Sequence, residues 1–323
     1  MEIYVVKPGD SVDSIAQQLD ANAEQIIFDN QLEYPYPLAV GQALLINRYV
    51  RNATRAITVS GYAYPFIDRE VLEQTLPYLS ELPIFSYGFT MEGELLPPSY
   101  GDDSWMITEA LRFGTMPILT LTPFGTDGNF NNQLIHSVVN NAAYTDRLIQ
   151  NLLETMSAKG YEGVDIDFEY ILAEDRDAFS AFVGQVAETM RASGYHTSVA
   201  LAPKTSADQA GLLYEGKDYR ALGEAADHVL LMTYEWGYTY GPPMAVAPVN
   251  QVRRVVEYAL TEIPNYKVDL GIPNYGYDWP LPFERGITKA TTLSNVGAVR
   301  LAVEQGAEIK FDNLAESPYF TYV

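Results

Sequence analysis

The sequence predicts an α/β protein with a small separate module at its N-terminus. Residues 56–273 alternate short apolar runs, typical of buried strands, with longer segments of helical periodicity. Residues 2–48 form their own pattern of strand, two short helices and strand. Repeated strand–helix units form a parallel sheet, either a closed barrel or a doubly wound sheet. Periodicity alone does not separate these two architectures.

The N-terminal module is predicted from its turn and capping residues. Lys7–Asp10 contains the Pro-Gly-Asp of a turn, and Ser11 is a helix N-cap residue. The expected elements are a strand at 3–6, a helix beginning at 11, a helix at 23–28 and a strand at 42–46. We expect residues 1–48 to form this module, residues 49–55 a linker and residues 56–323 the large domain.

The large domain is expected to contain seven parallel strands. They are predicted at 56–62, 82–89, 116–122, 164–169, 196–202, 228–234 and 267–273. Two helices flank the fourth strand, at 144–159 and 176–192, and each has an apolar stripe at helical spacing. The fourth strand should therefore lie in a covered sheet.

The fourth strand carries three acids on one side. Asp165, Asp167 and Glu169 alternate with three apolar residues, so alternate side chains stand about 6 to 7 Å apart on the same face. An exposed strand whose acids face water would show the same pattern. Inside a covered sheet, however, repulsion should hold at least one proton on the cluster near neutral pH. A retained proton is what a general acid needs to cleave a glycosidic bond.

These residues resemble a family signature. Glu162, Asp165, Asp167 and Glu169 are similar to the D-x-x-D-x-D-x-E motif of glycoside hydrolase family 18, the chitinase-like TIM barrels, with Glu162 in place of the first Asp. From about residue 2 onward the chain resembles the LysM-containing spore glycosylases, the cortex-lytic N-acetylglucosaminidases. The resemblance implies a TIM (β/α)8-type barrel.

The resemblance also implies catalytic roles. Glu169 would protonate the glycosidic oxygen, Asp167 would orient the substrate's acetamido group, and Asp165 would share a proton with Asp167. Met232–Glu235 is similar to the family's M-x-Y-D element, which implies that Tyr234 holds the acetamido oxygen. Glu235 stands where most members have Asp. The implied mechanism is retaining and substrate-assisted, and needs no metal or cofactor.

Other candidate site residues lie at the expected C-terminal ends of the strands, where such barrels bind ligands. They are aromatic or amphipathic, as a sugar cleft requires, but each could separately be a packing residue. The candidates for substrate binding are Tyr62, Tyr87, Phe89, Met232, Glu235, Asn274, Tyr275 and Trp279. The last three lie in a segment that resembles the family's cleft-lining extension of strand seven.

The N-terminal module resembles LysM. The likeness rests on Val6–Ser11, Ile15, Ala16, Asn30 and Val40–Ile46. LysM modules bind glycans that contain N-acetylglucosamine, in a groove beside the first turn and second helix. A cap on the barrel with no binding role is the alternative.

Residues 280–323 depart from the strand–helix rhythm and resemble the small α+β insertion that follows the seventh strand in many members. Its elements are expected at 288–292, 295–305, 308–312 and 319–323. A full barrel of the family continues to an eighth strand, and this chain ends before one. We therefore expect exposed strand edges and a poorly stable monomer.

Composition narrows the possible partners. Acids outnumber bases by 42 to 20, a net charge of -22, which disfavours nucleic acid and anionic lipid as partners. The chain has no cysteine, and His136, His196 and His228 make no metal motif. The 24 tyrosines suit stacking on sugars. No apolar run could span a bilayer, and no signal peptide is visible.

Three functions follow from the resemblance. The first is hydrolysis of the bond after N-acetylglucosamine in spore cortex peptidoglycan, by a protein associated with the spore coat, cortex or cell wall. The second is a non-catalytic coat protein that binds peptidoglycan or chitin, and the third is a chitinase. The intact acid motif favours hydrolysis, whereas the missing eighth strand favours the non-catalytic coat protein. The LysM resemblance and the absence of a visible signal peptide favour spore peptidoglycan over chitin.

Overall fold

The computed structural model describes residues 2–47, 56–125 and 128–323, so the predicted linker at 49–55 lies outside the described residues. The chain divides into two compact units. One comprises residues 56–233 and 254–271, and we call it the sheet unit. The other comprises residues 2–47, 234–253 and 272–323, and we call it the LysM-containing unit.

The sheet unit is built from alternating strands and helices, as predicted. Its strands are β3 (Glu81–Phe89), β4 (Leu95–Leu96), β5 (Met116–Leu121), β6 (Gly163–Ile166), β7 (His196–Leu201), β8 (His228–Leu231) and β9 (Val268–Leu270). Its helices are α3 (Arg69–Thr75), α4 (Ser104–Phe113), α5 (Asn132–Val139), α6 (Ala142–Lys159), α7 (Arg176–Ala192) and α8 (Tyr219–Ala225). Short 3-10 turns occur at Leu76–Tyr78, Ala173–Asp175 and Asn265–Lys267, and α9 (Val249–Glu262) has its first residues in the other unit.

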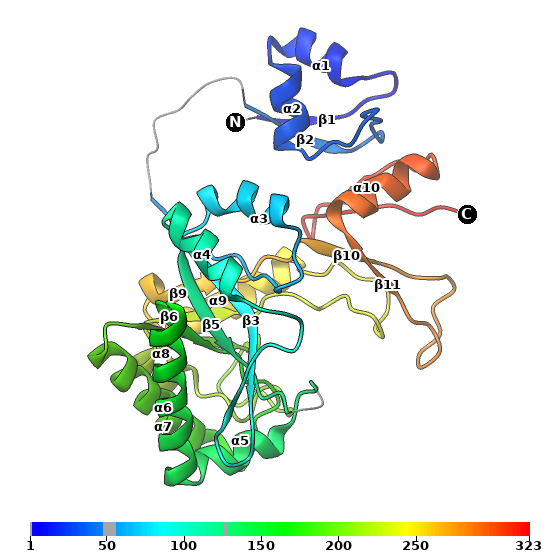
Figure 1. Ribbon diagram of the computed structural model, residues 1–323. Helices are drawn as coiled ribbons and strands as arrows, with labels where there is room; N and C mark the ends of the chain where they lie inside the picture. Colours follow the sequence, from blue (N-terminus) through cyan, green and yellow to red (C-terminus); the bar gives the residue numbers. More distant parts are fainter. Residues whose placement is uncertain (1, 48–55, 126–127) are drawn as a thin grey trace. The chain divides into compact units, whose positions relative to one another are not determined.

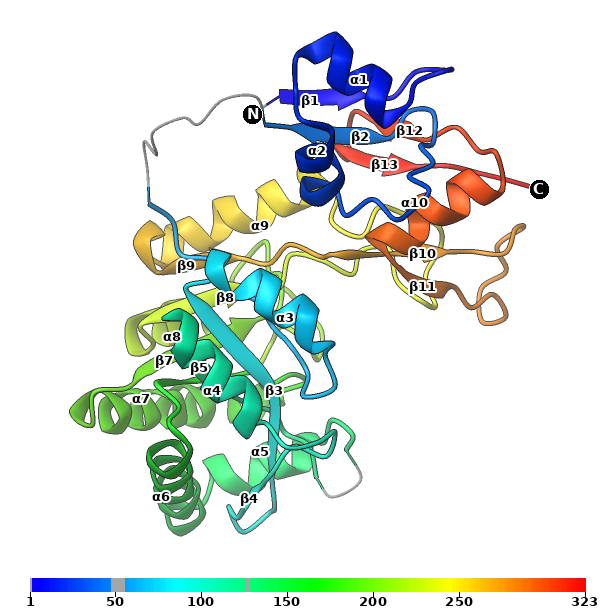
Figure 2. The ribbon, with the colours of Figure 1, turned by 45° about the horizontal axis from the view of Figure 1, so that its top comes forward.

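The strands form one curled sheet in the order β4-β3-β5-β6-β7-β8-β9. All neighbours from β3 to β9 pair in parallel, and only β4 is antiparallel. Helices α4, α7 and α8 contact β5, β7 and β8 respectively, while α5 and α6 pack on α7 (Figure 1 and Figure 2). The predicted α/β class is confirmed, with the acid strand β6 between β5 and β7.

The expected first strand, 56–62, is not a continuous strand. Ser60 and Ala63 make isolated parallel bridges to Glu81 and Ile84 of β3. The amide of Gly61 donates to the Glu81 carbonyl, and the Phe85 amide donates to the Ala63 carbonyl. Between these two bonds β3 contains Pro83, which has no N–H to donate. The ladder is therefore interrupted.

A buried carboxylate ties three elements of the sheet unit together. Asp103, at the start of α4, is fully buried and accepts hydrogen bonds from Tyr87 Oη on β3 at 2.8 Å and from Tyr161 Oη at 2.6 Å. Lys159, at the end of α6, forms an ion pair with the same carboxylate. Burial, and then the charge of Asp103, raises the pKa of both phenols well above its usual range.

We expect Asp103→Ala to destabilise the sheet unit by about 3 kcal/mol, because it leaves a half-buried ammonium and two buried phenols without their acceptor. Urea unfolding monitored by tryptophan fluorescence measures this change. Asp102→Ala is the matched control, since the Asp102 side chain is largely exposed. Equal effects of the two variants would contradict the structural role of Asp103.

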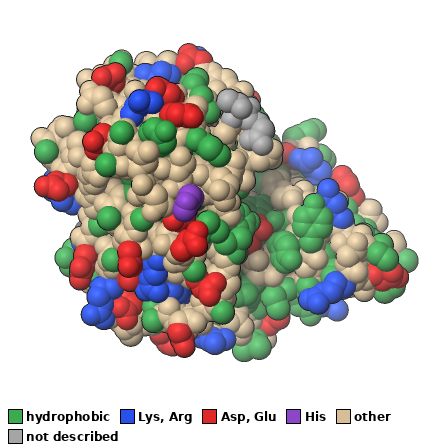
Figure 3. All heavy atoms as spheres, turned by 90° about the horizontal axis from the view of Figure 1, so that it is seen from below, with side chains coloured by type: hydrophobic (Ala, Val, Ile, Leu, Met, Phe, Trp, Pro, Cys, Tyr) green, Lys and Arg blue, Asp and Glu red, His purple; other side chains and the backbone are tan. Residues whose placement is uncertain are grey.

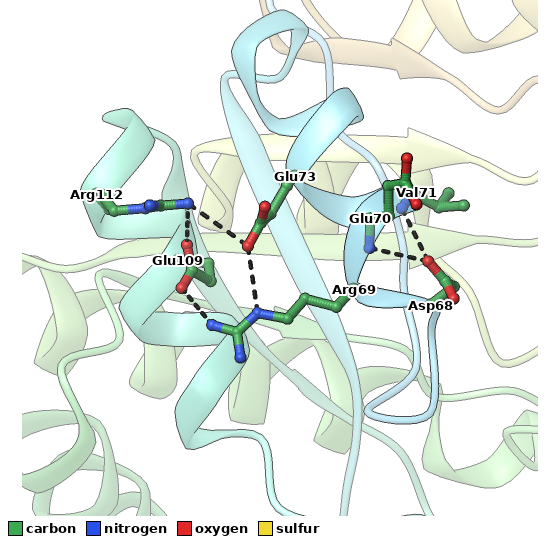
Figure 4. Close-up of polar contacts among 7 residues, drawn as sticks. All are labelled: Asp68, Arg69, Glu70, Val71, Glu73, Glu109 and Arg112. Atoms are coloured by element: carbon green, nitrogen blue, oxygen red, sulfur yellow. Dashed lines mark hydrogen bonds and ion pairs between the residues drawn. The ribbon is translucent and has the colours of Figure 1, made fainter.

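Helices α3 and α4 are joined by a charge network (Figure 4). Glu109 of α4 is buried and lies between Arg69 of α3, at 2.7 Å, and Arg112, at 2.6 Å. Glu73 of α3 contacts both arginines. Asp68 caps α3 by accepting from the amides of its first turn. The pairing lets a carboxylate be buried at this helix contact.

The LysM module has the predicted strand–helix–helix–strand order. Its elements are β1 (Glu2–Val5), α1 (Val12–Leu19), α2 (Ala23–Asp29) and β2 (Ala43–Ile46), with β1 and β2 antiparallel. Ser11 caps α1 as expected. The apolar side chains of all four elements form one small core: Tyr4, Val6, Val12, Ile15, Ala16, Ile26, Leu44 and Ile46.

Asn30, predicted as a LysM hallmark, fastens α2 to β2. Its Nδ2 donates to the carbonyls of Ile26 at 2.8 Å and Leu45 at 2.9 Å, and its Oδ1 accepts from the Leu45 amide at 2.7 Å. We expect Asn30→Ala to lower the free energy of opening at the Leu45 amide by about 2 kcal/mol. Hydrogen exchange on the full chain measures this. Unchanged protection at Leu45 would contradict the assignment.

The remaining elements of the LysM-containing unit are short. They are β10 (Tyr275–Asp278), β11 (Thr291–Ser294), α10 (Asn295–Glu304), β12 (Lys310–Asp312) and β13 (Ser317–Tyr319). Strand β10 pairs with β11 and β12 with β13, both antiparallel. The predicted helix at 295–305 is present, whereas the last strand lies at 317–319 and not at 319–323.

The surface is mixed in charge on the face drawn in Figure 3, where basic side chains lie among acidic ones. Among the described residues, no helix combines the length and apolar character needed to cross a membrane.

Candidate active site

The three acids lie where β6 ends. Asp165 is within β6 and is fully buried, whereas Asp167 and Glu169 follow the last strand residue, Ile166. The amide of Asp167 still donates to the Leu121 carbonyl of β5 at 2.9 Å, so the chain stays extended beside the sheet. Asp167 is 8% exposed, and Glu169 is half-buried. The strand is thus shorter than predicted, and both aspartates are buried.

Aromatic packing sets the direction of this segment. Phe168, between Asp167 and Glu169, is fully buried and stacks on Phe89 of β3, with ring centroids 5.3 Å apart. It also stacks on Phe179 and Phe182 of α7, each at 5.7 Å. Because neighbouring side chains in extended backbone point to opposite faces, this anchor turns both flanking carboxylates away from the helix layer.

Asp165 is held by two hydroxyl groups. Tyr62 Oη donates to its Oδ2 at 2.8 Å, and Ser198 Oγ of β7 donates to its Oδ1 at 2.6 Å. Burial raises the pKa of Asp165 from its usual value, and these two hydrogen bonds partly offset that rise. Tyr62, predicted to bind substrate, therefore contacts the innermost carboxylate of the cluster.

Asp167 has a buried oxygen that lacks a partner. Within the described residues, no hydrogen bond reaches its Oδ1. Burial is the largest cause that raises the pKa of Asp167, followed by the charges of Glu169 and Asp165. The sequence predicted that repulsion between the acids would keep a proton on the cluster. In the structure, burial raises the pKa of Asp167 more than repulsion does. A buried acceptor of this kind costs free energy unless a ligand supplies a donor.

Two predicted substrate-binding residues belong to the core. Tyr87 is 2% exposed and its hydroxyl is bonded to Asp103, while Phe89 is fully buried against Phe168. These placements contradict the binding roles predicted for both, because neither ring has a face left for a sugar. The alternation of β3 could not reveal this, since both faces of a covered strand are apolar.

Glu235 and Tyr234 lie in the LysM-containing unit. Glu235 Oε1 accepts from Tyr275 Oη and Tyr277 Oη of β10, each at 2.7 Å. Burial, and then the hydrogen bond to Glu235, raises the pKa of both phenols. The sequence left open what Glu235 contacts, and the structure shows that it contacts these two tyrosines. Tyr234, the residue before Glu235, is half-buried.

The segment 273–279, which follows the predicted seventh strand, contains a strand of its own. Tyr275–Asp278 is β10, which pairs with β11 in a separate antiparallel sheet. Trp279 Nε1 donates to the Gly241 carbonyl at 2.8 Å, its ring lies 5.6 Å from that of Tyr277, and Asn274 is exposed. The alternation of Tyr275 and Tyr277 with smaller or polar residues is typical of an antiparallel strand with one covered face, and not of a parallel strand buried on both faces.

Sequence reasoning missed two residues near the carboxylates, Ser198 and Lys217, whereas Tyr64 was expected at a strand end. Ser198 and Tyr64 lie beside the cluster, the latter with a pKa that burial raises and that the charge of Asp167 raises further. Lys217 is fully buried, and its charge acts on all three acids. Met232, predicted from the motif, is half-buried after β8, and its amide donates to the Leu201 carbonyl.

Comparison with known sequences identifies the family. The model of the family described as glycosyl hydrolases family 18 matches residues 120–322, and the LysM domain model matches residues 4–47. The chain belongs to glycosyl hydrolases family 18. The predicted family and enzyme class are thus confirmed.

Two relatives of this family 18 chain match it over almost its whole length. The chain is 37% identical to the "cortical fragment-lytic enzyme" of Bacillus subtilis (strain 168), covering 100% of this chain and 86% of that protein. It is 31% identical to the "putative sporulation-specific glycosylase YdhD" of the same strain, covering 99% and 75%.

Solved structures confirm the chitinase-like fold. The chain is similar to the spore cortex-lytic enzyme SleL of Bacillus megaterium QM B1551, with a TM-score of 0.88 and 30% identity over 99% of this chain and 85% of that one. It is also similar to a chitinase of Chromobacterium violaceum, with a TM-score of 0.77 at 24% identity, covering 83% and 82%. The second likeness concerns the fold alone.

Proposed function

We propose that this family 18 hydrolase cleaves the bond following N-acetylglucosamine in spore cortex peptidoglycan, with retention and with help from the substrate's own N-acetyl group. The observation that carries the proposal is the buried Oδ1 of Asp167, which has no hydrogen-bond partner among the described residues. The likeness to cortex-lytic relatives over the whole chain supports the substrate class.

The proposed reaction begins with Glu169 in its protonated form. Glu169 donates this proton to the glycosidic oxygen, and the leaving sugar departs as a neutral alcohol. The substrate's acetamido oxygen forms a bond to the anomeric carbon as the glycosidic bond breaks, which gives an oxazolinium ion. Water then opens this ion while the Glu169 carboxylate takes a proton from the water. Two displacements at one carbon restore its configuration.

Asp167 fits the role of acetamido orienter. Its free oxygen is an acceptor, the acetamido N–H is a donor, and the ionised carboxylate stabilises the positive oxazolinium. Asp165, held by Tyr62 and Ser198, shares the proton that Asp167 releases. We assign Tyr234 to the acetamido oxygen from the M-x-Y-E match alone.

The remaining predicted sugar contacts are assigned to residues that are exposed or only partly buried. They are Tyr62, Met232, Glu235, Asn274, Tyr275 and Trp279. The LysM module, residues 1–48, would retain the enzyme on the glycan, and residues 56–323 would contain the hydrolase. We propose a wall-associated protein of the spore that acts as a monomer on peptidoglycan.

Digestion of purified cortex peptidoglycan tests the cleaved bond. The reducing ends already present are first reduced with borohydride, and after digestion the products are reduced with borodeuteride, so that only new reducing ends carry the label that mass spectrometry detects. We expect the label on N-acetylglucosamine. A label on muramic acid, or no labelled product while the protein still sediments with the wall, would contradict the proposal. Faster cleavage of chitin oligosaccharides than of cortex fragments would favour a chitinase.

A further inference from the structure

Lys217 is a buried cation that the proposed reaction does not use. Its side chain is fully buried, and Nζ donates to the Ala200 carbonyl of β7 at 2.8 Å. Lysine is almost never fully buried without a partner charge, because the ammonium loses its hydration. A single carbonyl does not offset this cost, so opposite charges must lie nearby.

The loop that carries Lys217 is fastened at several points. Lys204 Nζ donates to the carbonyls of Ala207 at 3.1 Å and of Lys217 itself at 3.0 Å. Tyr219 Oη donates to the Ala202 carbonyl at 2.5 Å, which fixes the end of the loop to the end of β7. The loop is therefore a rigid support for the lysine.

Two backbone contacts aim Lys217 at the acids. In the β6–β7 ladder Ile166 pairs with Val199, so the Ala200 carbonyl that binds Nζ is level with Asp167. On the other side, Gly216 lies against the segment that follows Glu169, since a Cβ on Gly216 would stand 2.4 Å from the Ile171 carbonyl oxygen. Lys217 is thus held between β7 and the acid segment.

The mutual electrostatic effects of Lys217 and the three acids agree with this placement. Burial lowers the pKa of Lys217, and the charges of Asp167, Glu169 and Asp165 raise it in part. In return, the Lys217 ammonium lowers the raised pKa of Asp167 and of Asp165. The other groups that act on these acids are Glu81, whose charge raises the pKa of Asp165, and the hydroxyls of Tyr62 and Ser198. Tyr64 also faces Asp167.

Lys204 provides the contrast. It is also buried, at 1% exposed, but the largest effects of charge on it come from Arg176, Asp218, Asp208 and Glu215. Lys204 therefore stabilises the loop through its carbonyl contacts, whereas Lys217 interacts with the carboxylates.

We propose that Lys217 is a positioning residue whose buried ammonium offsets part of the negative charge of the carboxylate cluster and thereby favours the ionised form of Asp167. The inference rests on the proposed roles of Asp167 and Glu169. Without the ammonium, burial and repulsion would hold a further proton on the cluster, and the free Asp167 oxygen could not stabilise a cationic intermediate.

The pH profile of kcat/KM tests the proposal. Removing a cation raises the pKa of neighbouring carboxyls, so both limbs of the profile should move to higher pH in Lys217→Met, by about one unit. At pH values below the pKa of the acidic limb, a shift of about one unit makes kcat/KM of Lys217→Met about tenfold lower than that of the wild type. Lys217→Arg retains the charge and should restore the wild-type limbs. Lys204→Met, which lowers stability without removing this charge, should leave the limbs in place.

A second measurement separates this inference from the proposed function and needs no variant that might misfold. In wild-type protein carrying 15N-lysine and 13C-carboxyl aspartate, Lys217 Nζ and the Asp167 carboxyl should show a shared inflection with pH. Independent titrations of the two groups would overturn the role of Lys217, whatever the activity. If Glu169→Gln retained activity while the shared inflection was seen, the proposed chemistry would fail and the Lys217–Asp167 coupling would stand.

Discussion

Glu169→Gln should lower kcat/KM for cortex fragments by about 10³-fold, because a glutamine cannot donate the proton that the leaving sugar requires. The loss should be much smaller for an aryl glycoside of N-acetylglucosamine. An aryl oxide departs without protonation, so such a substrate bypasses the acid. This dependence on the leaving group distinguishes loss of the acid from loss of binding.

Two controls make the Glu169 test specific. Glu174→Gln, an exposed carboxylate on the 3-10 turn that follows the acid segment, should retain wild-type activity. Binding of the Glu169→Gln protein to cortex should be unchanged, as measured by sedimentation with the wall. Retention of more than a tenth of the wild-type activity on cortex fragments would remove Glu169 from the proposed role.

Asp167→Asn should produce two opposite effects, a loss of activity and a gain in stability. Activity should fall by about 10²-fold, since an amide does not stabilise a cationic oxazolinium as a carboxylate does. The stability effect follows from the raised pKa of Asp167. The folded state binds this proton more tightly than the unfolded state, so wild-type stability falls as pH rises above the ordinary value of 3.8 toward the folded one.

The stability gain of Asp167→Asn should therefore grow with pH. At pH 4 the aspartate is protonated in the folded protein and the two proteins should melt at similar temperatures, whereas at pH 7 the variant should melt higher. Melting curves at both values measure the difference. A constant difference between the two pH values would show that Asp167 titrates normally, and this would contradict its burial as the cause of the shift.

Local patterns predicted the elements that frame the site. The helices at 144–159 and 176–192 end within a few residues of α6 and α7, because their apolar stripes and the Gly160 cap are local signals. Alternation on 164–169 identified which side chains share a face. The LysM module was predicted from its turn, its Ser11 cap and Asn30 in the same way.

Features set by distant residues were not predictable in this manner. The hydroxyl of Tyr87 is bonded to Asp103, which is 16 residues away, and no periodicity shows that bond. Lys217 sits in a loop with no periodic pattern, and only the fold reveals its burial. The interrupted strand at 56–62 was foreseeable, however, since Pro83 in the neighbouring strand lacks an N–H.

The most direct test of the central claim is the stereochemistry of the first product. A soluble cortex fragment with N-acetylglucosamine at the cleaved position is followed by proton NMR during the first minutes, beside a matched fragment whose cleaved sugar lacks the acetyl group. Substrate-assisted cleavage predicts that the β-anomer is released first and that the de-N-acetylated fragment is not cleaved. Initial release of the α-anomer, or equal cleavage of both fragments, would contradict it.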